Sequence, residues 1–373
     1  MDNTAPSTPS LELRAKPSIY QIDAYAPGQS ELNDSGPIIK LSSNENPLGP
    51  SPKAVEAYRQ AAATLERYPD GAATTLREVL GAVHGIDPDH IVCGAGSDDL
   101  LRSLAQAFLG PGDEAIYTAH AFAMFKIFIL SAGATPVATP EKNFYADVDA
   151  ILAAVTPRTR AVFLANPNNP TGTYIPFSEV ERLRVRLPQN VLLVLDAAYS
   201  EYINEPDYQS GLSLVRITAN TVMTRTFSKI YGLAGARLGW CACPTKVAEI
   251  LHRVRTPFNV PAPNIAAGVA ALSDGVYVDQ AQAHNAKWLR WMTQELRALG
   301  IEVTDSVGNF VLIHFDGQNK RTGARANAFL NERRIILRPM EGYGLPNALR
   351  MTIGAEAENR AVVEALTEFM KRT

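Results

Sequence analysis

The chain has 373 residues, of which 46% are hydrophobic and 20% are charged, and its formal net charge is −3. This composition is typical of a globular enzyme, and the length allows two domains. The slightly negative net charge does not favour binding to nucleic acid or to an anionic membrane. The three cysteines, Cys93, Cys241 and Cys243, are too few for a disulfide framework and lack the spacing of a zinc or redox pair. The six histidines are scattered, so we expect no metal.

The N-terminal region predicts neither export nor membrane insertion. The first 17 residues are polar and contain no apolar core of a signal peptide. The most hydrophobic stretch, residues 121–130, is interrupted by Lys126 and is too short to span a bilayer. We therefore expect a soluble, cytoplasmic protein.

Strands and helices alternate in the first two thirds of the chain. An apolar run at residues 91–93 precedes the turn Gly94–Ser97, and a helix with one apolar face is predicted over residues 98–109. Further strands are predicted at 114–117, 135–138, 161–165, 191–195 and 221–225, with helices at 147–155 and 178–187. This alternation predicts an α/β fold whose central sheet is mostly parallel and covered by helices on both faces.

The pattern changes after about residue 245, where Pro257, Pro261 and Pro263 interrupt the chain. The segments that follow predict a smaller α+β domain, with helices at 279–299, 325–333 and the C-terminus and strands at 310–315, 335–337 and 349–353. We expect an N-terminal segment (1–48) that joins the small domain, a large domain (49–260) and a small C-terminal domain (261–373).

Polar or small residues follow four of the predicted strands directly. These are the turn Gly94–Ser97, Asn166, Asp196 and Lys229. In open α/β sheets, ligands bind beyond the carboxyl ends of the strands. We therefore expect these groups to converge on one crevice.

Lys229 lies just past the end of a predicted strand, among small and apolar residues. Such a lysine suits a Schiff base, because burial favours the neutral and nucleophilic amine. The hydroxyl groups of Thr226 and Ser228, together with the guanidinium of Arg237, could hold a dianionic phosphate. The combination points to pyridoxal 5'-phosphate, whose aldehyde needs a lysine and whose phosphate needs a cradle.

The acidic and aromatic residues after the fifth strand have structural and functional interpretations. Asp196 is either a helix cap or turn residue, or a buried carboxylate that keeps a pyridine nitrogen protonated. Tyr199 is either a core residue or a donor to the phenolic oxygen of the cofactor. Asn166 begins the turn-forming string that ends at Gly172, which is a rigid loop and could also aim Asn166 at the same oxygen.

Three further groups could bind anions. The turn Gly94–Ser97 opens a helix and offers backbone N–H groups to a phosphate, but Asp99 takes the place of the last glycine of a dinucleotide fingerprint. Arg338 and Arg350 lie in or near predicted strands late in the chain. They are either solvated or act as clamps for a carboxylate or phosphate.

The motifs together resemble a known family. The strings Ser43–Pro50, Asn166–Gly172, Asp196-x-x-Tyr199 and Ser228–Gly239 are similar to those of the fold-type I pyridoxal-phosphate aminotransferases. Within these, the first string and the ending Leu349–Gly354 resemble the histidinol-phosphate aminotransferase family. The resemblance runs from about Tyr25 to the C-terminus.

This resemblance implies a role for each matching residue. Lys229 would form the Schiff base and shuttle the proton, Asp196 would hold the pyridinium, and Tyr199 and Asn166 would bond the phenolic oxygen. Arg350 would bind the substrate α-carboxylate. The cofactor phosphate would be held by Ala95, Gly96, Ser97, Thr226, Ser228 and Arg237, with Tyr68 reaching it from the neighbouring subunit of an obligatory homodimer, and Tyr25 and Arg338 would bind the distal end of the substrate.

Two positions depart from the family pattern. Phe122 occupies the place of a tyrosine that stacks on the cofactor ring, so it keeps the π-face and loses the hydroxyl. Trp240 replaces a usual tyrosine after the last glycine of the lysine block. Neither change removes a catalytic group.

The resemblance implies a ping-pong transamination, through the Lys229 Schiff base, between L-glutamate and 2-oxoglutarate on one side and L-histidinol phosphate and imidazole-acetol phosphate on the other. This reaction belongs to histidine biosynthesis. An aromatic-amino-acid aminotransferase and a phosphothreonine-type decarboxylase remain alternatives with the same fold. A non-enzymatic regulatory module is a third, although the chain carries no basic helix-turn-helix.

Overall fold

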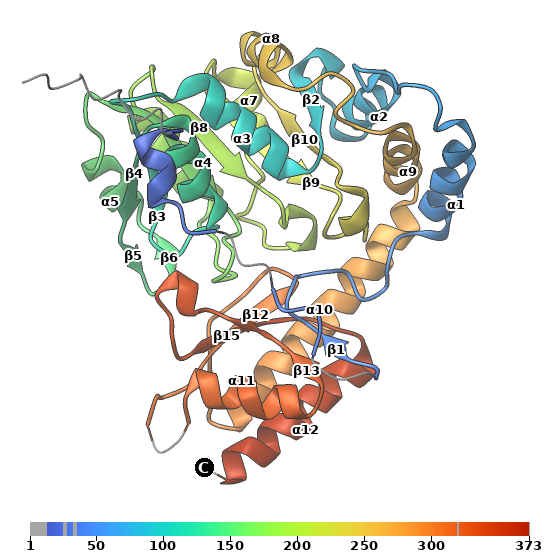
Figure 1. Ribbon diagram of the computed structural model, residues 1–373, viewed down its shortest axis with the longest axis vertical. Helices are drawn as coiled ribbons and strands as arrows, with labels where there is room; N and C mark the ends of the chain where they lie inside the picture. The colour runs from blue at the N-terminus through green and yellow to red at the C-terminus, as the bar shows by residue number, and fades with distance from the viewer. Residues whose placement is uncertain (1–12, 25–27, 33–35, 319–320, 373) are drawn as a thin grey trace, which may run out of the picture.

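The computed structural model describes residues 13–24, 28–32, 36–318 and 321–372. Two sheets of different size lie in separate parts of the molecule (Figure 1), a seven-stranded sheet in one part and a four-stranded sheet in the other. The long helix α10 (Gly275–Ala298) runs from the large part into the small one (Figure 1).

The large sheet is parallel except for one strand. Its strand order is β2-β10-β9-β8-β7-β3-β4, and only β10 runs antiparallel to both of its neighbours. The strands are β2 (Ile91–Gly94), β3 (Glu114–Thr118), β4 (Thr135–Thr139), β7 (Thr159–Ala165), β8 (Leu192–Asp196), β9 (Thr221–Thr226) and β10 (Gly239–Ala242).

Helices cover both faces of this sheet, which explains why its central strands β7 and β8 are apolar without alternation. Phe163 packs into a core with α3 and α4, whereas its neighbours Val162 and Leu164 pack on the opposite face with α5 and α6. The helices of this part are α1 (Pro52–Ala61), α2 (Thr74–His84), α3 (Ser97–Phe108), α4 (Met124–Ala132), α5 (Val148–Ala153), α6 (Phe177–Arg186), α7 (Leu212–Ile217), α8 (Thr245–Val254) and α9 (Ala262–Leu272).

The small sheet is antiparallel, in the order β11-β12-β15-β14, and α10, α11 and α12 complete its core. Its elements are β11 (Glu302–Val303), β12 (Phe310–His314), α11 (Gly323–Glu332), β14 (Arg338–Pro339), β15 (Ala348–Thr352) and α12 (Glu356–Arg372). The N-terminal strand β1 (Ile39–Lys40) pairs in parallel with β13 (Ile335–Ile336). This pairing attaches the N-terminal segment to the small part.

Short elements complete the chain. A hairpin of β5 (Glu141–Lys142) and β6 (Tyr145–Ala146) lies beyond β4. The single-turn 3₁₀ helices are η1 (Pro17–Gln21), η2 (Ala62–Thr64), η3 (Pro88–His90), η4 (Ser200–Tyr202), η5 (Ala234–Ala236) and η6 (Glu341–Tyr343).

The predicted fold class is confirmed, with differences in particular elements. Strand β10 and helix α4 are absent from the prediction, because β10 contains a glycine and no β-branched residue and α4 is apolar around most of its surface. The N-cap residue of α3 is Gly96, with φ 89° and no side-chain hydrogen bond to the helix. The domain boundaries at 48/49 and 260/261 remain a prediction.

Within the described part of the chain, no helix is both long and apolar enough to cross a lipid bilayer. The same residues contain no group of three or more acidic, histidine or cysteine side chains that could hold a metal ion.

Candidate active site

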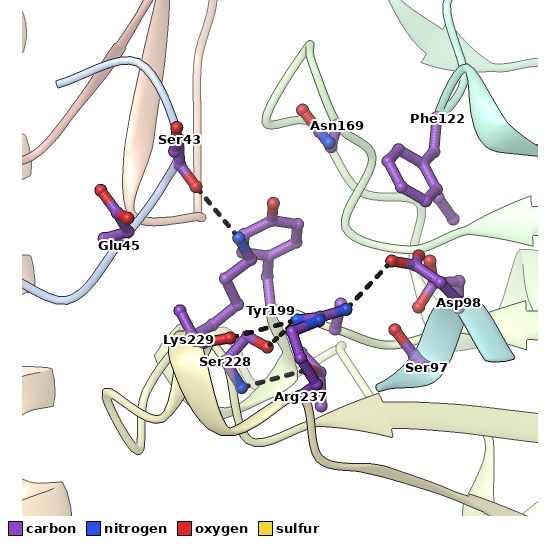
Figure 2. A pocket seen from close by; sticks show the side chains of 15 residues that line it. Ser43, Glu45, Ser97, Asp98, Phe122, Asn169, Tyr199, Ser228, Lys229 and Arg237 are labelled. Carbon is purple, nitrogen blue, oxygen red and sulfur yellow. Dashed lines mark hydrogen bonds and ion pairs between the residues drawn. The ribbon is translucent and has the colours of Figure 1, made fainter. Parts of the chain in front are cut away.

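A cavity of about 230 Å³ opens at the carboxyl ends of β7, β8 and β9 and at the start of α3. Its polar groups come mainly from the loops that follow the strands and from the start of α3, and the N-terminal segment lies on one side (Figure 2). The lining residues are Ser43, Glu45, Ser97, Asp98, Phe122, Ala165, Asn169, Asp196, Ala198, Tyr199, Thr226, Ser228, Lys229, Ala234 and Arg237. The structure thus brings together Ser97, Asp196 and Lys229, three of the four groups expected to converge.

Lys229 presents its amine to this cavity (Figure 2). Its Nζ donates a hydrogen bond to the carbonyl oxygen of Ser43 at 3.2 Å and lies 5.7 Å from the centre of the Tyr199 ring. Burial, and next the nearby Arg350 guanidinium, lower the pKa of Lys229 to about 8, against the opposing effect of Asp98 and Glu45. A substantial neutral fraction of this amine is therefore available near neutral pH, as a nucleophile requires.

Asp196 is the last residue of β8, and it is 6% exposed. Thr224 donates a hydrogen bond to Asp196 Oδ1 at 3.1 Å. Burial raises the pKa of Asp196 to about 7, with a smaller contribution of the same sign from Asp98. A buried carboxyl with this pKa calls for a cationic or N–H partner in the cavity that it lines.

An anion cradle lies between the start of α3 and the loop that carries Lys229. Arg237 Nη1 donates to Ser228 Oγ at 3.2 Å, and Arg237 Nη2 donates to Asp98 Oδ2 at 3.3 Å. A side chain at Gly96 would collide with the Arg237 guanidinium at 2.5 Å, so glycine is what allows the helix start and the arginine to face one another. Backbone N–H groups at a helix start together with a guanidinium fit a phosphate group.

The remaining expected cradle residues lie at the same place. Thr226 and Ser228 are buried and line the cavity, and Ser228 N donates to Thr226 Oγ1 at 3.1 Å. Gly239 opposes them from β10, where a Cβ atom would lie 2.4 Å from the backbone nitrogen of Ser97. Ala95 precedes the start of α3, and its N–H donates to Asp99 at 3.2 Å, so this N–H is already paired.

Asn166 does not take the position that the sequence predicts. Its side chain forms two hydrogen bonds with the backbone of Ile175, donating to the carbonyl oxygen at 3.1 Å and accepting from the N–H at 2.9 Å, and it does not line the cavity. Asn169, from the second Asn-Pro pair of the same loop, lines the cavity instead (Figure 2). The prediction for Asn166 is therefore wrong, because the loop folds back and pairs Asn166 with Ile175.

Arg350 approaches the site from β15 of the small sheet and is 7% exposed. Its guanidinium donates to Asn169 Oδ1 at 2.5 Å and to the carbonyl oxygen of Ser42 at 2.7 Å. The guanidinium also lies 5.6 Å from the centre of the Phe310 ring. A planar cation that is buried and held beside the cavity fits a carboxylate ligand.

A second cavity of about 500 Å³ contains Arg338, and it lies next to the first because Ala123, the neighbour of Phe122, lines it. Its polar lining includes Lys126 as well as Arg338. Its wall is otherwise formed by Gln21, Ile22, Asp23, Ala24, Gln29, Ile127, Leu130, Pro339, Glu341, Gly342 and Tyr343. Tyr25, which was predicted to act at the same end of the substrate, lies outside the described residues.

The aromatic residues singled out in the sequence have different surroundings. Phe122 lines the first cavity and packs edge-on against Phe125, with ring centres 5.9 Å apart. Trp240 is buried in the core, stacks on His84 and lines neither cavity. Tyr68 is 83% exposed and stacks on Phe258 at 4.6 Å, outside the lining of either cavity.

Several lining residues were not singled out in the sequence, notably Ser43, Glu45, Asp98 and Asn169. Ser43 and Glu45 belong to the string on which the family resemblance rests, so a signal for them was present. Asp98 follows the glycine turn, and Asn169 repeats the Asn-Pro pattern of Asn166. Local sequence does not distinguish such repeats.

Comparisons with known proteins agree with this geometry. Residues 36–366 match the family model "Aminotransferase class I and II". The chain is 52% identical over 358 residues to a histidinol-phosphate aminotransferase of Nitrobacter winogradskyi, covering 96% of this chain and 98% of that protein. It is also 52% identical over 355 residues to a histidinol-phosphate aminotransferase of Rhodopseudomonas palustris, with 95% and 97% covered.

A solved structure shares the fold over nearly the full length. The crystal structure of histidinol-phosphate aminotransferase from Sinorhizobium meliloti, in complex with pyridoxal-5'-phosphate, superimposes with a TM-score of 0.84 at 26% sequence identity and covers 97% of this chain and 99% of that chain. Together with the family match, these relatives show that the chain belongs to the class I and II aminotransferases.

Proposed function

We propose that this chain is a pyridoxal-phosphate-dependent histidinol-phosphate aminotransferase, which moves an amino group between L-glutamate and imidazole-acetol phosphate. One observation carries the proposal: the amine of Lys229, the carboxyl of Asp196 and the anion cradle at Arg237 all face a single cavity. The relatives that are 52% identical over nearly the whole chain bear the name of this activity.

The residues of the cavity fit the cofactor. Lys229 would bind its aldehyde, Asp196 would accept the N–H of its ring, and Arg237 with Ser228 and the start of α3 would hold its phosphate. Pyridoxal phosphate supplies an aldehyde that takes up amino groups and a protonated ring that withdraws electrons from the substrate carbon. A cationic ring beside Asp196 would lower the pKa of this carboxyl from about 7 and keep it charged near neutral pH.

Three side chains would then act on protons and on the ring oxygen. The amine of Lys229, with a pKa of about 8, would take the proton from the substrate carbon and return it in each half of the ping-pong reaction. Tyr199 would donate a hydrogen bond to the ring oxygen. Asn169, rather than Asn166, would supply the second hydrogen bond there, since it is the asparagine that lines the cavity.

The two substrates would use different cations. Arg350 is buried and beside the cavity, so it suits the α-carboxylate of glutamate. Arg338 and Lys126 line the adjoining cavity of about 500 Å³, which suits the phosphate of histidinol phosphate. The family resemblance implies that Tyr25, which lies outside the described residues, acts at the same end of the substrate.

We further propose a homodimer in which Tyr68 completes the partner's cofactor site. An aromatic side chain that is 83% exposed and stacked on Phe258 provides a rigid, unburied contact group on the surface of one subunit. Cytoplasmic location remains a prediction.

The test of the substrate is a comparison of kcat/KM for histidinol phosphate, phenylalanine and tyrosine, each with 2-oxoglutarate. We expect a clear preference for histidinol phosphate. The adjoining cavity also has apolar residues, Ile22, Ile127 and Leu130, which makes an aromatic amino acid the competing substrate. A preference for phenylalanine would contradict the proposed substrate and leave the aminotransferase family unchanged.

A further inference from the structure

The segment from Leu41 to Glu45 connects the small sheet to the active site. Leu41 N donates to Ile336 O at 2.8 Å, and its carbonyl oxygen accepts from Thr352 N at 2.9 Å. One residue further on, Arg350 donates to the carbonyl oxygen of Ser42 at 2.7 Å. Strand β13 on one side and strand β15 of the small sheet on the other therefore hold the backbone of this segment just before the segment enters the cavity.

Asn44, within this segment, reaches a residue of the large part. The residue is 1% exposed, and its Nδ2 donates to Tyr199 Oη at 2.9 Å. Its backbone N–H donates to Thr352 Oγ1 at 2.8 Å, and the Thr352 hydroxyl donates back to Asn44 Oδ1 at 3.4 Å. Asn309 Nδ2 donates to the Asn44 carbonyl oxygen at 3.0 Å. The contact of the Thr352 hydroxyl with Asn44 Oδ1 leaves the Nδ2 end of the amide facing Tyr199.

The direction of this hydrogen bond limits what the Tyr199 hydroxyl can do. A phenolic hydroxyl has one hydrogen to donate and lone pairs with which to accept. Because Asn44 donates to the oxygen, the Tyr199 hydrogen must point to another acceptor. Tyr199 lines the cavity beside Lys229 (Figure 2), so an acceptor bound there can receive it.

The protonation state of Tyr199 is compatible with a donor role. Burial raises the pKa of Tyr199 to about 12, although Arg350 and the hydrogen bond from Asn44 oppose this shift. The hydroxyl therefore keeps its hydrogen throughout the pH range in which an aminotransferase works.

We propose that Asn44 is a positioning residue that turns the Tyr199 hydroxyl into an obligate donor toward the ring oxygen of the bound cofactor. This inference rests on the proposed function, since the acceptor is the cofactor. The donated hydrogen bond favours the more negatively charged, deprotonated form of the lysine-bound cofactor. Removal of the Asn44 amide should therefore raise the pH at which the bound cofactor loses its proton.

The test follows the visible absorbance of the holoenzyme as a function of pH. Asn44→Gly removes the amide without backbone strain, because Asn44 has φ 55° and glycine accepts this conformation. We expect the titration midpoint to rise by about one pH unit, the shift that loss of one hydrogen bond to a charged group corresponds to. Asn44→Asp provides a second variant of nearly the same shape, whose carboxylate would accept the Tyr199 hydrogen and turn it away from the cavity.

A neighbouring asparagine serves as the matched control. Asn46 lies in the same part of the chain, but its Nδ2 donates to the carbonyl oxygen of Ile230 at 2.8 Å and not to Tyr199. Asn46→Ala should leave the midpoint at its wild-type value. An equal rise in Asn46→Ala would show that general loosening of the segment causes the shift, and it would overturn the inference.

A double-mutant cycle tests whether Asn44 acts through Tyr199. In a Tyr199→Phe background, Asn44→Gly should produce no additional shift, because the hydroxyl that it orients is absent. Additive shifts, or a wild-type midpoint in both Asn44 variants, would overturn the inference alone. A wild-type protein whose bound pyridoxal phosphate shows no lysine-dependent visible absorbance would instead overturn the proposed function.

Discussion

Replacement of Asp196 by asparagine should separate stability from catalysis at the end of β8. Asparagine has nearly the same shape as aspartate and can still accept the hydrogen bond from Thr224, which is 3.1 Å from Asp196 Oδ1. The variant loses only the ionisable group. Its effects therefore report what the buried charge contributes.

In the cofactor-free protein, the negative charge of Asp196 lowers the free energy of unfolding. The pKa rises from 3.8 to about 7 on folding, chiefly through burial. The folded state therefore binds the Asp196 proton more tightly than the unfolded state. The stabilisation that comes from this protonated carboxyl is fully present below pH 3.8 and is lost as the pH rises through 7. A shift of about three units corresponds to a penalty of about 4 kcal/mol at pH 8, as an order of magnitude.

We expect the cofactor-free Asp196→Asn variant to be more stable than the wild type at pH 8, by up to about 4 kcal/mol, and nearly equal to it at pH 4. Urea unfolding of both proteins at several pH values measures this difference. A stability gap that does not change with pH would refute the reasoning.

In the enzyme with bound cofactor, the same substitution should be harmful. Loss of the buried partner of the ring N–H should raise the activation free energy by about 3–5 kcal/mol, which corresponds to a fall in kcat of roughly 10²- to 10⁴-fold. Steady-state turnover of glutamate measures it. An Asp196→Asn variant with wild-type kcat would exclude Asp196 as the partner of the cofactor ring.

Four further substitutions test the roles proposed for other residues. Lys229→Ala should abolish both the yellow absorbance of the bound cofactor and turnover, whereas transamination at the wild-type rate would remove Lys229 from the mechanism. Arg338→Ala should reduce kcat/KM for histidinol phosphate more than for phenylalanine, roughly 10- to 100-fold more if one charge-assisted hydrogen bond to the phosphate is lost; equal losses would place the phosphate elsewhere. Asn169→Ala should reduce kcat/KM, whereas Asn166→Ala should mainly lower the free energy of unfolding, by about 1–3 kcal/mol, because it leaves the Ile175 backbone groups unpaired. Kinetics and urea unfolding on both asparagine variants distinguish these outcomes, and the reverse pattern would return the catalytic role to Asn166.

The local sequence was sufficient to predict much of the large sheet. Runs such as residues 161–165 and 191–195 are apolar because each strand is covered on both faces, and the polar residue after each run marks the strand end. Strand β10 was missed because its four residues, Gly239–Ala242, include a glycine and no β-branched residue. Its antiparallel place between β2 and β9 depends on pairing with strands that are distant in sequence.

The same contrast applies within the site. Asn166 and Asn169 both precede a proline in one loop, and nothing local says which of them faces a ligand. The difference between them arises when the loop folds back and the backbone of Ile175 forms hydrogen bonds with both the oxygen and the nitrogen of the Asn166 amide. The contact of Asn44 with Tyr199 joins residues 155 positions apart, so no window of sequence contains it.

The sequence by itself thus determined the alternation of strands and helices, the polar strand ends and the family, because these depend on local periodicity and on short motifs. Only the tertiary structure decided which asparagine lines the cavity, where Arg338 and Arg350 lie, and what holds the Tyr199 hydroxyl. Hydrogen bonds are directional and join groups from distant segments, so they become defined only when the segments have packed together.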